Sequence, residues 1–349
     1  MQHEPTDWHW PIAGVAGARG VVGRVFCSIL CDAGLPPDNL RAFGHEEGHA
    51  VDYGGVEVPV HVIDDAAARE LDILFLAVDA VQSREIMAGP GAHVPLVVDN
   101  SSAFRLADGV PLVVPEANGH AARERTVNLI ANPNCTTAAA VVALAPIRDL
   151  AGLESVDLAS YQAVSGAGRA GLDAFDAERG TSHRDAATDT PFHGRIADSV
   201  VPQIDVLDET GWSGEERKIH AELRKILEMP DLDVAATTVR VPVRTGHSVA
   251  LHLRTQRATT VDALEEALRN APGLEYRPAD GSERHPMPLD VEGRDPVIVG
   301  RLRAIPGRER GFALWVSSDN LRKGAALNAV QCAAAADPER YGKLLPPPR

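Results

Sequence analysis

Cys135 is placed as a catalytic nucleophile would be. It follows the apolar run 127–131 and the turn Asn132-Pro133-Asn134, and an alanine-rich helical pattern begins directly after it. Pro133 fixes its own φ and biases Asn132 away from helix, so a strand-to-helix turn is expected here. Such a turn places the thiol at a helix N-terminus, where backbone N–H groups and the helix dipole favour a thiolate. A small buried residue before a core helix is the alternative.

Two further polar side chains are expected near this thiol because the sequence predicts a hairpin that carries both. Residues 234–243 are predicted as a strand, 244–246 as a turn and 247–254 as a second strand, with Arg240 and His247 on it. An imidazole beside a thiolate can hold it ionised as a pair and then move protons as acid and base. Arg240 offers a cation for a carboxylate. A structural role in a packed strand is the alternative for a single histidine.

Arg105 is a candidate ligand for a small anion. It follows a short predicted strand at residues 96–98 through the polar turn 99–104. The carboxyl ends of parallel strands meet at one edge of a sheet, and a guanidinium there can contact an anion through two parallel hydrogen bonds. A surface arginine is the alternative for this stretch taken alone.

A glycine-rich turn near the N-terminus predicts a dinucleotide site. A strand at residues 11–15 leads into G-A-R-G-V-V-G at 17–23, and a helix follows at 24–33. Glycines permit a tight turn and close approach of the backbone, while the helix N-terminus faces the pyrophosphate. The spacing is G-x-x-G-x-x-G rather than G-x-G-x-x-G, so a glycine turn in any βα unit is the alternative.

The end of the second predicted strand, residues 39–43, is where such a fold selects the ribose of its cofactor. The loop there is G-H-E-E-G-H at 44–49 and contains Glu46 and Glu47. Two carboxylates suit a ribose diol and repel a 2′-phosphate, which favours NAD over NADP. A solvated acidic loop is the alternative.

The other predicted elements continue an α/β pattern. The apolar run 71–78 is typical of a strand that is buried on both faces of a parallel sheet. Residues 173–199 are polar and give no clear assignment. Further strands are predicted at 155–163, 297–303 and 311–317, and helices at 83–88, 213–227, 259–271 and 321–336.

Length and composition limit the class of protein. At 349 residues the chain is long for a single core, so two domains are expected. A formal net charge of −15 without a basic patch argues against binding to nucleic acid or an acidic membrane. The four cysteines lack metal-ligand spacing, and neither a signal peptide nor an apolar run of about 20 residues is present. We therefore expect no metal site and a cytoplasmic location.

Seven blocks occur in a fixed order along the chain. They are G-A-R-G-V-V-G at 17–23, V-V-D-N-S-S-A-F-R at 97–105, P-L-V-V-P-E at 111–116, N-P-N-C-T-T at 132–137, Y-Q-A-V-S-G-A-G at 161–168, R-V-P-V-R-T-G-H-S at 240–248 and D-N-L-R-K-G-A-A-L-N at 319–328. With these blocks the chain resembles the aspartate-β-semialdehyde dehydrogenase family of the bacterial type, over residues 11–340.

The resemblance implies an α/β fold with a Rossmann dinucleotide-binding domain at residues 1–132 and a mixed α/β catalytic and dimerisation domain at 133–320. The helix in 321–349 is expected to return to the first domain. The implied reaction is the reversible NAD(P)-dependent reductive dephosphorylation of L-4-aspartyl phosphate to L-aspartate 4-semialdehyde and inorganic phosphate. A homodimer or a dimer of dimers is expected, with neither nucleic acid nor membrane as a partner.

The resemblance also assigns roles to individual residues. Cys135 matches the nucleophile, and His247 matches the acid/base that returns a proton to the departing thiolate. Gln162 and Arg240 match the groups that orient the substrate, and Glu216 matches the group that meets its amino group. Phosphate is assigned to Arg105, Asn134 and Lys218. With the residues of the glycine turn and the acidic loop, the cofactor positions are Gly17, Arg19, Gly20, Val21, Val22, Gly23, Glu46, Ser165, Gly166 and Asn320.

Backbone N–H groups near Asn134 and Cys135 are candidate donors to the tetrahedral oxyanion. Three departures from the family lie in the cofactor half. Arg19 stands where the family usually has Thr, H-E-E at 45–47 replaces a Ser-Arg-Ser type sequence that binds the 2′-phosphate, and V-D-A at 78–80 replaces small residues. Two alternatives stay open: an enzyme like N-acetyl-γ-glutamyl-phosphate reductase, and a non-enzymatic or specialised-pathway paralogue that keeps the fold.

Overall fold

The apolar runs of the N-terminal third form the centre of a seven-stranded sheet in the computed structural model, which describes residues 9–180, 190–278, 280–281 and 284–349. The strand order is β3-β4-β2-β1-β5-β6-β7, and all pairs are parallel except β3 with β4. The strands are β1 (Ala13–Ala16), β2 (Leu40–Phe43), β3 (His49–Tyr53), β4 (Val56–His61), β5 (Ile73–Leu76), β6 (Leu96–Asp99) and β7 (Leu129–Ala131).

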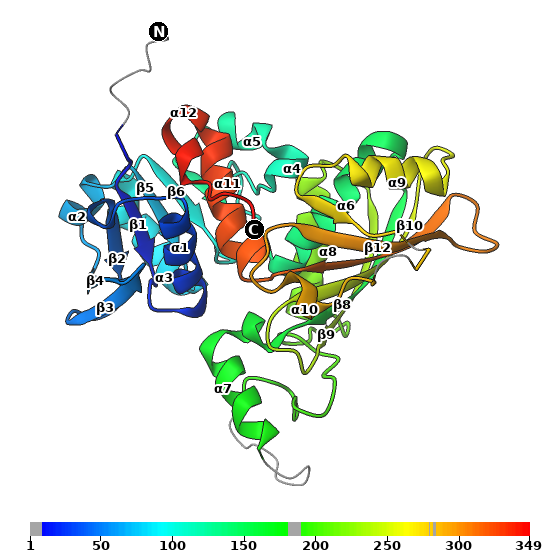
Figure 1. Cartoon of the computed structure of the whole chain (residues 1–349), viewed down its shortest axis with the longest axis horizontal. Coiled ribbons are helices and arrows are strands. Elements are labelled where there is room, and N and C mark those ends of the chain that lie inside the picture. The colour runs from blue at the N-terminus through cyan, green and yellow to red at the C-terminus, as the bar shows by residue number, and fades with distance from the viewer. Residues whose placement is uncertain (1–8, 181–189, 279, 282–283) are drawn as a thin grey trace.

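Helices cover both faces of this sheet (Figure 1). On one face, α1 (Val21–Asp32) and the C-terminal α11 (Leu327–Ala336) share a core with β1, β5 and β6. On the other face lie α2 (Asp65–Arg69) and α3 (Ala80–Ala88). The end of the chain thus packs into the core that the beginning of the chain forms. The boundaries 1–132, 133–320 and 321–349 stay a prediction.

A second sheet of six strands has the order β11-β12-β13-β10-β8-β9. Its strands are β8 (Ser155–Gln162), β9 (Asp233–Arg240), β10 (His247–Arg254), β11 (Leu274–Tyr276), β12 (Val297–Ala304) and β13 (Gly311–Ser318). One face packs on α6 (Cys135–Ala151), α8 (Gly214–Ile226) and α9 (Val261–Arg269) in a single hydrophobic core. The remaining helices are α4 (Pro115–Asn118), α5 (His120–Arg123), α7 (Gly168–Arg179), α10 (Pro288–Val291) and α12 (Pro338–Tyr341).

The α/β class, with a Rossmann domain and a mixed second domain, is confirmed. The predicted hairpin at 234–254 is wrong, because β8 lies between β9 and β10: it pairs parallel with β9 and antiparallel with β10. Residues 241–246 therefore cross the end of β8 instead of forming a tight turn. Part of the unassigned stretch 173–199 lies in α7, and its residues 181–189 lie outside the described residues.

Candidate active site

Cys135 is the first residue of α6, and residues 132–134 connect it to the end of β7. The Oδ1 atom of Asn134 accepts the N–H groups of Thr136 at 2.9 Å and Thr137 at 3.3 Å and so caps the helix. The predicted strand-to-helix turn is confirmed. A π-helix at Arg322–Ala326 backs onto this turn, since a Cβ added at Gly324 would lie 2.9 Å from the Cβ of Cys135.

Burial disfavours the charged forms of both the Cys135 thiol and the His247 imidazole. Burial, and then the carboxylate of Glu215, raise the pKa of Cys135 to about 11, although Arg240 lowers it. Burial and the nearby charge of Arg240 hold the pKa of His247 well below its usual range. Burial therefore opposes the expected thiolate–imidazolium pair, whereas the helix dipole at this position favours its thiolate.

The backbone of Ala163 joins His247 to Arg240. Its N–H donates to Nδ1 of His247 at 3.0 Å, and its carbonyl accepts Nη1 of Arg240 at 2.7 Å. Because Nδ1 accepts, the neutral imidazole carries its proton on Nε2, which is buried without a hydrogen-bond partner. Arg240 is also buried, its Nε lacks a partner, and it forms no ion pair within the described part of the chain. A guanidinium in this state is a ready site for a carboxylate.

Glu215 is the carboxylate that lies beside Cys135. Its Oε1 accepts Nδ2 of Asn134 at 2.7 Å and Nε2 of Gln162 at 3.0 Å. Gln162 in turn ends β8 and is in register with Arg240 at the end of β9. The structure thus brings together the sequence-predicted Cys135, Asn134, Gln162, Arg240 and His247, with Glu215 as a group that the sequence reasoning missed.

Glu216 has a structural position instead. Its Oε2 accepts the N–H of Ser213 at 2.9 Å in a capping box, and its Oε1 accepts the N–H of Thr238 at 2.9 Å. Backbone donors thus hold both oxygens of Glu216, and the structure places Glu215, not Glu216, beside Cys135. The pattern Ser-x-x-Glu at 213–216 was the signal that could have shown this. Which of the two meets a substrate amino group stays a prediction.

Arg105 and Lys218 are the two predicted phosphate-binding cations, and they lie near each other. Arg105 acts electrostatically on both the Cys135 thiol and the Lys218 ammonium. Each cation already has an acidic partner: Arg105 lies 3.0 Å from Glu222, and Lys218 lies 2.8 Å from Asp205. An anion here would therefore be held by directed N–H groups rather than by a large excess of positive charge.

The glycine turn has the shape of a pyrophosphate cradle. Gly17 has a φ of 77°, and a Cβ there would lie 2.3 Å from the carbonyl oxygen of Ala77. Gly20 caps α1 without a side chain, so the N–H groups of Val21, Val22 and Gly23 keep no acceptor within the helix. These features fit the pyrophosphate of a dinucleotide.

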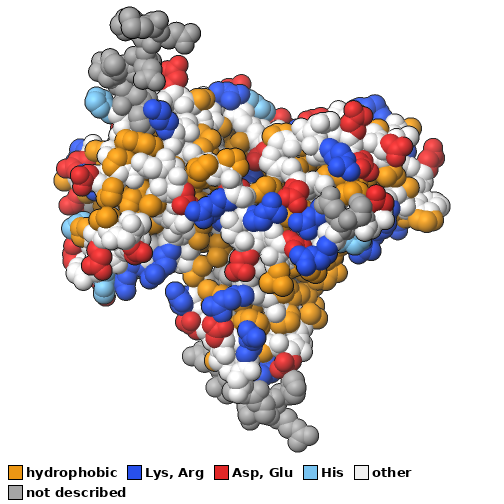
Figure 2. Space-filling view, in the orientation of Figure 1, with side chains coloured by type: hydrophobic (Ala, Val, Ile, Leu, Met, Phe, Trp, Pro, Cys, Tyr) orange, Lys and Arg blue, Asp and Glu red, His pale blue; other side chains and the backbone are white. Residues whose placement is uncertain are grey.

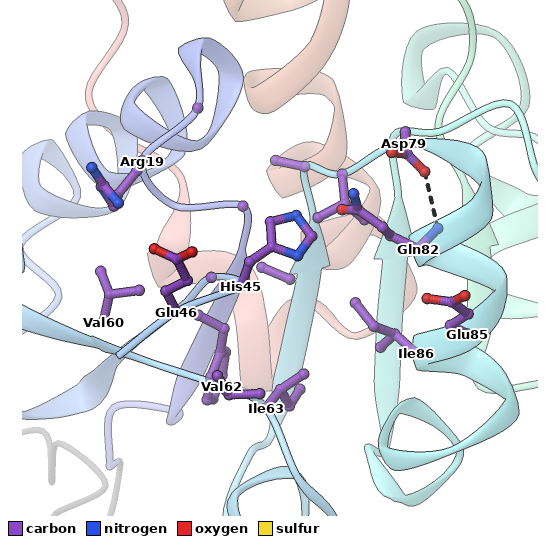
Figure 3. A pocket seen from close by; sticks show the side chains of 17 residues that line it. Arg19, His45, Glu46, Val60, Val62, Ile63, Asp79, Gln82, Glu85 and Ile86 are labelled. Carbon is purple, nitrogen blue, oxygen red and sulfur yellow. Dashed lines mark hydrogen bonds between the residues drawn. The ribbon is translucent and has the colours of Figure 1, made fainter. Parts of the chain in front are cut away.

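A cavity of about 700 Å³ extends from this turn across the carboxyl ends of β1, β2, β4 and β5 to α3. Its volume suits the nucleoside half of a dinucleotide. Figure 3 shows Arg19, His45 and Glu46 together at one end, with Asp79 and Glu85 opposite them. Arg19 is the one lysine or arginine among the described residues that line it. The cavity is therefore acidic overall.

Only one of the two predicted ribose carboxylates lines this cavity. Glu46 does, whereas Glu47 accepts the N–H of Val62 at 2.9 Å and contacts Nδ1 of His61 at 3.0 Å. Glu47 thus holds its loop against the end of β4. The predicted contact with the cofactor ribose therefore falls to Glu46 alone. The hairpin of β3 and β4, which supplies this contact for Glu47, was not predicted.

The predicted cofactor residues Ser165, Gly166 and Asn320 lie next to His247. The amide of Asn320 donates to Oγ of Ser165 at 2.9 Å and accepts the N–H of Gly246 at 2.9 Å. A Cβ added at Gly166 would lie 3.3 Å from Nε2 of His247. At Gly166 the backbone therefore lies beside the imidazole without a side chain between them.

Within the residues that the structure describes, no group of three or more His, Cys, Asp or Glu side chains could hold a metal ion. No helix in the same residues is long and apolar enough to cross a membrane.

Two family models match the chain: "Semialdehyde dehydrogenase, NAD binding domain" at residues 12–125 and "Semialdehyde dehydrogenase, dimerisation domain" at residues 144–323. The chain is 41% identical to an aspartate-semialdehyde dehydrogenase of Streptomyces akiyoshiensis, over 94% of this chain and 99% of the relative. It is 38% identical to that of Aquifex aeolicus, over 91% and 96%.

A solved structure leads to the same group of proteins. Aspartate semialdehyde dehydrogenase II from Vibrio cholerae superposes with a TM-score of 0.87 at 35% identity, covering 94% of this chain and 99% of that one. A second structure of the same protein, described as complexed with ASA, gives the same TM-score and identity.

Proposed function

Because the chain belongs to the aspartate-semialdehyde dehydrogenase family, we propose that it converts L-4-aspartyl phosphate to L-aspartate 4-semialdehyde and inorganic phosphate, reversibly and with NAD(P). One observation in this chain carries the proposal. The thiol at the start of α6, an unpaired buried guanidinium and an imidazole N–H converge on one site. These are the groups that acyl transfer to sulfur and its reversal require.

Two charged groups of the substrate, its α-carboxylate and its ammonium, each have a partner in the site. Arg240 binds the α-carboxylate, since it is a buried cation without a carboxylate partner. Glu215 binds the ammonium, with Gln162 beside it to orient the chain. An acylated nitrogen carries no charge, so a carboxylate at this position favours the free amine over an N-acetylated substrate. This argues against the N-acetyl-γ-glutamyl-phosphate alternative.

Covalent chemistry proceeds at Cys135. The thiol first loses its proton to solvent, because Nε2 of His247 already carries one. The thiolate then attacks the acyl carbon, the bond from that carbon to the phosphate oxygen breaks, and phosphate leaves toward Arg105 and Lys218. A bound nicotinamide would supply the hydride that reduces the resulting thioester. The thiohemiacetal oxyanion on Cys135 then collapses: its carbon–sulfur bond breaks, the aldehyde forms, and the sulfur leaves as a thiolate to which the N–H at Nε2 of His247 can donate a hydrogen bond.

The tetrahedral oxyanion needs a donor, and the structure narrows the choice. The N–H of Asn134 donates to Glu222 at 2.7 Å, so it is not available for this purpose. The N–H of Cys135 occupies the first position of the helix and keeps no intrahelical acceptor. We assign the oxyanion to this group; such a donor contributes about 3 kcal/mol in comparable sites.

The direct test is oxidation of L-aspartate 4-semialdehyde in the presence and absence of inorganic phosphate. We expect reduction of the nicotinamide cofactor that depends on phosphate. A folded, dinucleotide-binding protein without any such activity would support the non-enzymatic paralogue instead.

The same assay, run with both cofactors, tests their preference. We expect kcat/KM for NAD to be at least equal to that for NADP, because Glu46 lines the cavity and would repel a 2′-phosphate. Arg41 cannot compensate, since it donates to the carbonyls of Asp38 and Leu40. Glu46→Ser is expected to raise kcat/KM for NADP about tenfold while changing that for NAD less.

Glu57→Ser, which removes an exposed carboxylate from β4 outside the cavity, is the matched control and should change neither value. A wild-type preference for NADP above tenfold would mean that Arg19, not Glu46, governs the ribose.

Substitutions of the two adjacent glutamates of α8 are expected to have different effects on substrate binding. Glu215→Gln is expected to raise the KM for semialdehyde at least tenfold, because the ammonium loses its partner. It should also lower the pKa of Cys135, since a negative charge that disfavours the thiolate is removed. The rate of alkylation by iodoacetamide, measured from pH 7 to 10, should therefore rise at lower pH than in the wild type.

Glu216→Gln is the control, and it should leave both the KM and the alkylation profile unchanged while lowering the melting temperature. If Glu216→Gln raised the KM for semialdehyde and Glu215→Gln did not, Glu216 would be the group that binds the substrate amino group.

We also propose a homodimer, alone or within a dimer of dimers, formed through the face of the six-stranded sheet that lies away from α6. Tyr161 and Trp315 contact each other there, with ring centroids 5.3 Å apart, and Tyr161 is partly exposed. Figure 2 shows hydrophobic side chains gathered nearby, over α10 and β9. Sedimentation equilibrium should give the mass of at least two chains, and a monomer at micromolar concentration would contradict this.

A further inference from the structure

Glu222 is a buried carboxylate for which the proposed mechanism has no role. Its side chain is 1% exposed, its Oε1 lies 3.0 Å from Nη1 of Arg105, and its Oε2 accepts the N–H of Asn134 at 2.7 Å. One carboxylate thus joins the cation assigned to phosphate with the residue that precedes the nucleophile. We propose that Glu222 is a positioning residue that aims Arg105 at the phosphate; the inference rests on the phosphate role proposed above for Arg105.

Arg105 is held in a single orientation. Its Nε donates to the carbonyl of Asn132 at 2.9 Å and its Nη2 to the carbonyl of Asn100 at 2.8 Å, while Nη1 contacts Glu222. A guanidinium has five N–H donors, so one remains on each terminal nitrogen. These two remaining donors are available to bind oxygens of a phosphate. Of these three partners of Arg105, only Glu222 carries a charge. The orientation of the guanidinium is therefore expected to depend most on Glu222.

The position of Glu222 on α8 supports a role in the site rather than in the core alone. Glu215, Lys218, Glu222 and Lys225 recur at intervals of three and four residues, and so lie along one face of the helix. Lys225 donates to the carbonyls of Arg105 at 2.8 Å and Val110 at 2.9 Å, which fixes the loop that carries Arg105. Glu222 lies between this loop and the side chains around Cys135.

The test is Glu222→Gln, which keeps the shape and removes the charge. The KM for inorganic phosphate should rise at least tenfold, while the KM for semialdehyde stays within threefold. A purely structural role would lower stability without this difference between the two substrates. Because Glu222 acts through Arg105, its effect on the phosphate KM should be lost in Arg105→Ala/Glu222→Gln relative to Arg105→Ala alone.

The outcomes separate this inference from the proposed function. If Arg105→Ala leaves the phosphate KM unchanged, the assignment of Arg105 to phosphate is wrong. If Arg105→Ala raises it and Glu222→Gln does not, only the inference about Glu222 fails. Glu216→Gln, which alters another buried carboxylate of α8, should change neither KM. If Glu222→Gln does not fold, Glu222→Asp is the second variant, because it withdraws the carboxylate by one methylene. It should raise the KM for phosphate more than the KM for semialdehyde. Equal changes in both KM values would overturn the proposal.

Discussion

Cys135→Ser is expected to lower kcat at least a thousandfold. A serine hydroxyl ionises far less readily than a thiol, and the resting site offers no base for it. The Nδ1 atom of His247 accepts the N–H of Ala163, so its proton lies on Nε2 and that atom has no free lone pair. The measurement is kcat for phosphate-dependent oxidation of semialdehyde, with the melting temperature and dinucleotide binding followed in parallel.

Cys31→Ser is the matched control, because Cys31 is the other cysteine that is only partly buried and it lies on α1. This variant should keep wild-type activity, and iodoacetamide should still inactivate it through Cys135. Activity of Cys135→Ser within tenfold of the wild type would remove Cys135 from the mechanism.

The position of Cys135 at the start of a helix could be predicted because short-range signals determine it. A proline turn, an asparagine that can cap and an alanine-rich run specify the start of α6 within a few residues. The glycine turn before α1 is local in the same way. Where backbone conformation and capping decide a position, the sequence alone was sufficient.

Long-range pairing could not be predicted in this way. Strands β9 and β10 are separated by six residues and look like a hairpin, yet β8, which precedes them by some seventy residues, pairs with both. The sequence of residues 241–246 gives no sign that β8 lies between β9 and β10. The consequence for the site is large, because Gln162 at the end of β8 lies in register with Arg240.

The ionisation of Cys135 illustrates a second limit. A helix N-terminus favours a thiolate, and the sequence shows that contribution. The opposing contributions come from burial by other segments and from Glu215 on α8, which is far away in the chain. Their sum is known only once the fold has placed them around the sulfur.

His247→Asn is expected to lower kcat at least a hundredfold, within the range typical of a positioned acid or base. The Oδ1 atom of asparagine can take the place of Nδ1 and keep the contact with Ala163, while the group at Nε2 is lost. The wild type should show no decline in kcat/KM centred near pH 6.5. Burial and Arg240 hold the pKa of His247 well below that value, so protonation begins only at lower pH.

His247→Gln separates proton transfer from hydrogen bonding. The glutamine amide can reach the position of Nε2 and donate a hydrogen bond there, but it cannot give up its proton. If His247 transfers a proton to the departing sulfur, both variants should lose activity to a similar extent. Recovery of His247→Gln to within tenfold of the wild type would show that the imidazole only stabilises charge. The proton for Cys135 would then have to come from solvent.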